Sequence, residues 1–223
     1  MPAIDLTQGP QTLSRFDVLG QLADGEKHFI KHVGLLDTDT TQSIEAGGNV
    51  SAVHMKPPLE QEGDFKVDVA GNVPLNSDEI KIISTWIEKI IDELPKNKRK
   101  QYIIRPPWKD ECDVNTGVRR YRRYSCVGFV LDSHQQVQIE LLKVEESALP
   151  DTSKKTLMSV YFDSDSNSES DLRRHQDLLL KWGLEGNGPW KVVLPGFVLN
   201  ALNRPTDQIR RMPYKAKEGD EKF

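Results

Sequence analysis

The chain has 223 residues, of which 37% are hydrophobic and 29% are charged, and its formal net charge at pH 7 is −4. This length suffices for one well-packed domain over residues 1–223, and the acidic balance disfavours general nucleic-acid binding, which normally requires a basic surface. No apolar run approaches the roughly 20 residues that a membrane helix requires, and residues 1–9 lack the basic start and apolar core of a secretory signal. We therefore expect a cytoplasmic protein without a transmembrane segment.

The first half of the chain shows strand patterns followed by one long helical pattern. Residues 29–37 are predicted to form a strand, with residues 41–46 as its antiparallel hairpin partner. A shorter strand is expected at residues 50–55, within a loop rich in glycine and proline. Residues 77–94 carry apolar side chains at helical spacing after Ser77, a residue type that caps helices, and so predict a helix.

The second half of the chain alternates short strands with helices. We expect strands at residues 102–104, 157–162 and 190–194, and helices at residues 125–138 and 171–182. Residues 163–171 are rich in serine and acidic side chains and predict a linker. From about residue 204 onward the composition predicts a polar C-terminal tail.

The chain contains two cysteines, Cys112 and Cys126. In a cytoplasmic protein two cysteines are expected to remain free thiols. Their spacing, and that of the histidines, matches no zinc motif, so neither a metal nor another cofactor is predicted. Carboxylates surround Cys112 and disfavour its thiolate form, which leaves Cys126 as the candidate nucleophile.

The residues around Cys126 predict a helix start that favours a thiolate. Ser125 is a good N-cap and would put Cys126 in the first helical turn, where unpaired backbone amides and the helix dipole stabilise negative charge. The arginines of residues 119–123 would add positive potential, or would bind an anionic substrate group, a phosphate or nucleic acid together with the interleaved tyrosines. The alternative for Cys126 is a small cysteine packed in the core.

A thiolate nucleophile needs a base, and the base needs an orienting partner. His32 lies inside the predicted strand 29–37, and Glu45 is the one charged residue of its predicted hairpin partner. A hairpin that turns about Thr38 and Asp39 would pair His32 with Glu45 and hold their β-carbons about 5 Å apart. This spacing predicts Glu45 as the residue that orients His32; a different register, or a core histidine bonded to the backbone, is the alternative.

These segments resemble a known family. Residues 32–36 (HVGLL) and 43–46 (SIEA) are similar to two strands of NlpC-like cysteine peptidases, and residues 125–130 (SCVGFV) are similar to their nucleophile helix. Because the histidine precedes the cysteine, the order resembles the circularly permuted branch, which includes YiiX-like proteins and the lecithin:retinol acyltransferase group. The resemblance implies one α+β domain with a papain-like fold, an antiparallel sheet or small barrel packed against helices, with helix 77–94 as an insertion.

The same resemblance implies a cysteine hydrolase or acyltransferase that acts on an amide (peptide or isopeptide) or ester bond. Cys126 would be the nucleophile, His32 the base and Glu45 the third residue of the triad, with a peptide or acyl ester as substrate. The family usually has aspartate before the cysteine and serine after it, where this chain has Ser125 and Val127. Val127 favours the alternative function, a catalytically inactive papain-like binding module.

The remaining histidines are weaker candidates. His175 stands where the base would lie in the unpermuted order, but its neighbours predict an exposed helix face. His28 shares a strand face with His32 by the period of two, although it lies at the polar start of the strand. His54 and His134 are expected to be structural or exposed.

Overall fold

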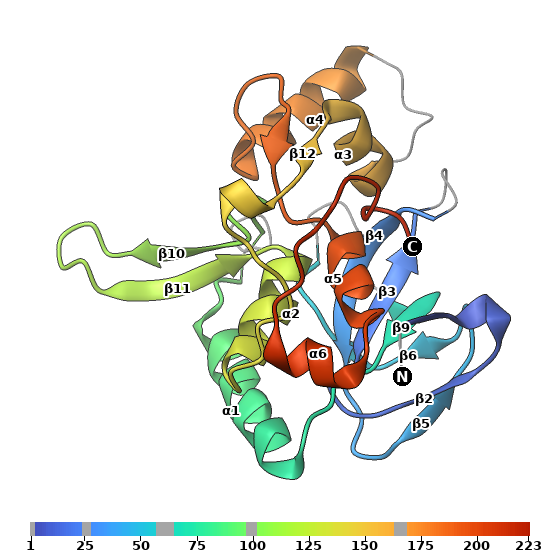
Figure 1. Ribbon diagram of the computed structural model, residues 1–223. Coiled ribbons are helices and arrows are strands. Elements are labelled where there is room, and N and C mark those ends of the chain that lie inside the picture. Colours follow the sequence, from blue (N-terminus) through green and yellow to red (C-terminus); the bar gives the residue numbers. More distant parts are fainter. Residues whose placement is uncertain (1–2, 24–27, 57–64, 97–101, 163–168) are drawn as a thin grey trace.

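The computed structural model describes residues 3–23, 28–56, 65–96, 102–162 and 169–223, the last without the side chains of residues 169–174. The fold is α+β, with helices packed against mainly antiparallel strands, and the described residues form no closed barrel (Figure 1). The expected α+β class is therefore confirmed, in its form with an antiparallel sheet.

Five strands form the central sheet, and all neighbours in it are antiparallel. In spatial order they are β1 (Ile4–Asp5), β9 (Val69–Gly71), β3 (Val18–Leu22), β4 (Ile30–Leu36) and β7 (Ala52–Val53). Strand β4 confirms the prediction for residues 29–37. All its residues except Lys31 are buried, because elements cover both faces of the sheet at this strand.

The other strands form two-stranded pairs. These are β2 (Gln11–Leu13) with β5 (Gln42–Ile44), β6 (Asn49–Val50) with β8 (Phe65–Lys66), β10 (Trp108–Cys112) with β11 (Arg119–Tyr124), and β12 (Asp151–Thr152) with β13 (Trp190–Lys191). The predicted hairpin between residues 29–37 and 41–46 is therefore wrong. The link between them lacks a tight-turn dipeptide, and Ile44 instead packs with Leu13 in a small second core.

Six helices complete the described structure. They are α1 (Ser77–Glu93), α2 (Cys126–Gln135), α3 (Lys154–Tyr161), α4 (Glu169–Lys181), α5 (Pro195–Leu202) and α6 (Thr206–Arg211), and two short 3-10 helices are η1 (Leu6–Gln8) and η3 (Glu146–Ala148). Helices α1, α2 and α4 confirm the predicted helices to within a few residues. The cap of α1 is Asn76 rather than Ser77, since the Asn76 side chain accepts hydrogen bonds from the Asp78 and Glu79 amides.

Helices α3 and α5 differ from the sequence-based expectations. The sequence predicts a strand at residues 157–162, but these residues belong largely to α3. Ser153 caps this helix, and the side chains of Leu157 and Val160, three residues apart, are both buried on one helix face. Helix α5 has no periodic pattern because nearly all its residues are buried. The predicted strand at residues 102–104 forms only an isolated bridge at Tyr102. Residues 163–168 of the predicted linker lie outside the described residues.

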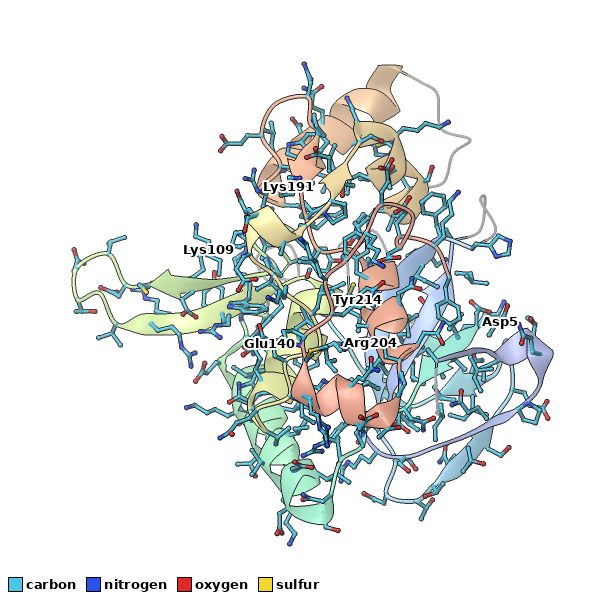
Figure 2. The ribbon with its side chains drawn as sticks, in the orientation of Figure 1. Asp5, Lys109, Glu140, Lys191, Arg204 and Tyr214 are labelled. Carbon is cyan, nitrogen blue, oxygen red and sulfur yellow. The ribbon has the colours of Figure 1, made fainter. Side chains whose placement is uncertain are left out.

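The predicted polar tail is wrong, because residues after 204 pack onto the domain. Arg204 lies over the ring of Tyr214, with 5.3 Å between the guanidinium carbon and the ring centroid (Figure 2). The Asn200 side chain donates to the carbonyls of Asp220 and Lys222 at 2.9 and 2.8 Å, and Lys222 bridges to Phe29 beside β4. These polar residues satisfy backbone groups, which a composition-based prediction of a tail does not consider.

Candidate functional site

Helix α2 is the central helix, and it positions Cys126 at its first residue. The Ser125 hydroxyl accepts a hydrogen bond from the Gly128 amide at 2.8 Å, so the predicted cap is confirmed. A β-carbon on Gly128 would stand 1.9 Å from the carbonyl oxygen of Pro107, so only glycine permits this close approach of two backbones. Residues Cys126 to His134 are all buried.

The thiol of Cys126 lies beneath aromatic side chains. The Tyr102 hydroxyl is 3.6 Å from Cys126 Sγ, and both side chains are fully buried. Trp182 packs edge-on against Tyr102, with 5.5 Å between ring centroids, and it is 1% exposed. Since Cys126 is fully buried, a substrate carbonyl reaches this sulfur only if the side chains that cover it move.

His32 lies on β4 in an aromatic cluster. Its ring stacks on Phe65 at 5.6 Å between centroids, and its Nε2 is 2.5 Å from Nδ1 of His54. A β-carbon on Gly34, two residues along the strand from His32, would stand 3.0 Å from both His54 and Phe65. Since residues two apart in a strand share a face, His32 and Gly34 both face the His54–Phe65 side of the sheet.

Cys126 lies on the other side of the same sheet. Val33 and Leu35, the alternate residues of β4, belong to the main core, which also contains Cys126 and the apolar residues of α2. Helix α2 packs against β4 on that face. His32 therefore points away from α2, and the structure does not bring the predicted nucleophile and base together.

Glu45 lies in neither environment. It is exposed in the turn after β5, where its carbonyl accepts a hydrogen bond from the Gly48 amide at 3.2 Å. Because β5 pairs with β2, the strand geometry that predicted Glu45 beside His32 does not form. The residue that contacts His32 instead is His54, which was expected to be structural or exposed.

The pairing of β4 with β7 explains why His54 was missed. Leu35 is opposite Val53 in this antiparallel pair, and continuing the register places His54 opposite Gly34. The sequence predicts a short strand at residues 50–55 but contains no feature that selects β4 as its partner. Only the tertiary pairing assigns His54 to the neighbourhood of His32.

The two neighbouring imidazoles are neutral at pH 7. Burial lowers the pKa of His32 well below its usual value of 6.5, and electrostatic interactions with His54, Lys56 and Lys31 lower that pKa further. Burial and then Lys56 lower the pKa of His54 to about 4. The contact between them is therefore a hydrogen bond of two neutral rings, and neither ring supplies the positive charge that would stabilise a thiolate.

Of the other histidines, His134 and His175 are packed against other residues, and His28 is exposed. His134 is fully buried in α2, and its Nδ1 lies 2.8 Å from the Val130 carbonyl. His175 packs against Phe162 at 4.2 Å between ring centroids, and His28 is exposed.

The arginines of β11 are paired with carboxylates rather than aimed at Cys126. Arg119 pairs with Glu93, Arg120 with Asp113, Arg122 with Asp110 and Asp132, and Arg123 with Glu111. Most of these carboxylates lie on or beside β10, directly across the hairpin. The arginines therefore neutralise neighbouring charges, which weakens the expectation that they bind phosphate or nucleic acid.

Comparison with known proteins does not assign this chain to a family. No family model, no curated protein and no solved structure matches this chain. Within the part of the chain that the structure describes, no three His, Cys, Asp or Glu side chains are grouped to hold a metal ion. None of the described helices has the length and apolar character to cross a membrane.

Proposed function

We propose that this chain is a binding module in which Cys126 is a core residue rather than a nucleophile. One observation carries the proposal: the central sheet separates the thiol from the His32–His54 pair. Nucleophilic catalysis requires the base within hydrogen-bond reach of the nucleophile, at roughly 3 Å. A sheet between the two groups does not permit that distance.

Burial and protonation support the same proposal. Cys126 is fully buried under Tyr102, as expected for a cysteine that acts as a small apolar side chain. The lowered pKa values of His32 and His54 also disfavour the imidazolium that forms when a histidine accepts the proton of a thiol. Core packing therefore explains the positions of Cys126 and His32 without a catalytic role.

A thiol hydrolase or acyltransferase is the second candidate, and the start of α2 favours it. The Ser125 cap leaves Cys126 at a helix N-terminus, where a thiolate is stabilised. The Tyr102 hydroxyl next to Sγ is a hydrogen-bond donor suited to a thiolate or an oxyanion. This candidate requires a base within reach of the sulfur. Either β4 rearranges and brings His32 to it, or a different residue acts as the base.

An acyl-capture experiment separates the two candidates. The protein is incubated with p-nitrophenyl esters of short and long acyl chains and with peptide esters, and the acyl adduct on each cysteine is read by peptide mass spectrometry. We expect no adduct on Cys126 and the same hydrolysis rate in wild type and Cys126→Ala. The exposed Cys112 provides the matched control variant, Cys112→Ala.

An adduct on Cys126 that persists in Cys112→Ala and disappears in Cys126→Ala would overturn the binding-module proposal. Loss of that adduct in His32→Ala would further identify His32 as its base. Circular dichroism of each variant shows that a lost adduct is not a lost fold.

A further inference from the structure

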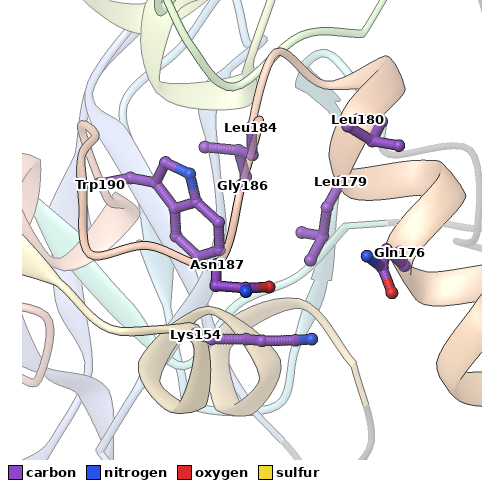
Figure 3. Close-up of a pocket in the computed structure, with 8 residues that line it drawn as sticks. All are labelled: Lys154, Gln176, Leu179, Leu180, Leu184, Gly186, Asn187 and Trp190. Atoms are coloured by element: carbon purple, nitrogen blue, oxygen red, sulfur yellow. The ribbon is translucent and has the colours of Figure 1, made fainter.

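A small apolar pocket lies between α3, α4 and the turn before β13, and its walls are largely hydrophobic. Its volume is about 70 Å³, and Leu179, Leu184 and Trp190 form its apolar lining (Figure 3). Lys154, Gln176 and Asn187 supply polar side chains to the same pocket. Apolar walls with a few convergent polar groups are typical of small-molecule sites.

The indole of Trp190 is held rigidly in this pocket. Its Nε1 donates a hydrogen bond to the Glu185 carbonyl at 2.6 Å, and its side chain is buried. Gly188 has φ +77°, and a β-carbon there would stand 2.9 Å from the indole ring. The turn therefore fixes the aromatic wall before any ligand arrives, which lowers the entropy cost of binding.

The charge at the pocket is positive. Lys154 is the first residue of α3, so its ammonium adds to the positive end of the helix dipole. Lys191 on β13 forms an ion pair with Asp151 at 2.9 Å, whereas no carboxylate of the described residues pairs with Lys154. An anionic group at Lys154 would be complementary to this charge, and the Gln176 and Asn187 amides offer further hydrogen-bond donors.

A larger hollow lies elsewhere in the structure, and the carboxylate in its lining is already hydrogen-bonded to the protein. It measures about 290 Å³, and its lining includes Arg15, Asp17 and Asn72. The Asp17 carboxylate already accepts hydrogen bonds at 2.7 Å from the Ser14 and Val73 amides and from the Asn72 side chain. These hydrogen bonds stabilise the loop junction, and the Arg15 guanidinium forms ion pairs with Asp37 and Asp39.

We propose that the Lys154–Trp190 pocket binds a short branched aliphatic carboxylate. An apolar cavity of about 150 Å³ takes benzene, so a cavity of about half that size takes an aliphatic group of roughly three or four carbons. The carboxylate would then lie at Lys154. A free acid and the C-terminal residue of a peptide share this chemistry, and the inference rests on the proposed function because it names the ligand of the binding module.

The test is a titration of the full chain with 3-methylbutanoate, followed by NMR of the tryptophan indole N–H signals. The Trp190 signal is assigned with Trp190→Phe. We expect saturable movement of that signal with a Kd on the order of 1–10 mM, the range for a ligand of this size. Acetate tests the need for the aliphatic group, 3-methylbutanamide tests the need for the charge, and N-acetylleucine tests the peptide end as source.

Lys154→Gln should weaken 3-methylbutanoate binding at least fivefold. Lys155→Gln, at the adjacent exposed position outside the pocket lining, should leave it unchanged. Binding of the amide as tight as that of the acid, equal weakening by the two lysine variants, or no saturation at 50 mM would each overturn the proposal. Acyl capture at Cys126 is a separate readout, so failure of this pocket proposal is distinguishable from failure of the binding-module proposal.

Discussion

Strand β11 and the start of helix α2 are consecutive in the chain, yet they lie in opposite environments. The β10–β11 hairpin projects from the domain (Figure 1), and its arginines are paired with carboxylates at the surface. Strand β11 ends at Tyr124, and by Cys126 the chain has entered the core, where this cysteine is fully buried.

The contrast shows that residue type alone does not assign chemistry. A row of arginines is a binding site only if its charge is uncompensated, and here the facing strand compensates it. A cysteine and a histidine form a catalytic pair only if they share one side of a structure. Cys126 and His32 lie on opposite sides of β4, so they do not form such a pair.

Acidification should have the largest effect, because it acts on the buried histidines. Burial lowers the pKa of His134 from 6.5 to about 4. Between these pH values the unfolded chain binds the proton and the folded chain does not, so the free energy of unfolding falls as pH decreases from 6.5 toward 4. The loss from His134 should be about 3 kcal/mol over this window.

Urea unfolding at pH 7 and pH 4 measures that loss, and His134→Phe should reduce the pH dependence. Asp17 acts in the opposite direction, since burial raises its pKa to about 6 and its contribution increases stability as pH falls through that value. The comparison of variant with wild type therefore isolates His134. His28→Gln, at an exposed position, serves as the control.

Arg122 should contribute most of the hairpin's electrostatic stability. Its guanidinium pairs with Asp132, which is 4% exposed and also accepts a hydrogen bond from the Tyr124 hydroxyl. Arg122→Gln would leave that carboxylate buried without its cation, at a cost of about 2 kcal/mol in urea unfolding. Arg120→Gln breaks only an exposed pair with Asp113 and should change the free energy of unfolding far less. Equal losses would show that burial does not distinguish the two pairs.

The cap of α2 should matter more than the cap of α3. Ser125→Ala leaves the buried Gly128 amide without its hydrogen bond and should lower the free energy of unfolding by about 1–2 kcal/mol. Ser153→Ala removes the corresponding bond at an exposed helix start and should cost about 0.5–1 kcal/mol. Thermal or urea unfolding of both variants gives the comparison.

The smallest effect is expected for nucleic acid. Because the β11 arginines are paired, a labelled oligonucleotide should show no binding at 20 mM salt by fluorescence anisotropy. Binding that weakens steeply as salt increases would instead show that the arginines exchange their carboxylate partners for phosphates.

Local patterns were sufficient for several elements of this protein. Helix α1 and the Ser125-capped start of α2 follow from side chains within a few residues of one another, and the apolar run of β4 indicates a buried strand. Helix α5 was missed because it is apolar all round and has no amphipathic period. The polar tail was mispredicted because its backbone is held by a residue outside it: the Asn200 side chain of α5 donates hydrogen bonds to the Asp220 and Lys222 carbonyls.

The amino-acid sequence by itself determined the α+β class, the main helices and the position of Cys126 at a helix start. Only the tertiary structure decided that β5 pairs with β2, that His54 rather than Glu45 contacts His32, and that the sheet separates His32 from Cys126. The physical reason is that caps and periodicities act over a few residues. Strand partners and sheet faces depend on which apolar surfaces meet across the whole chain, and a shift of one residue reverses a side chain's face.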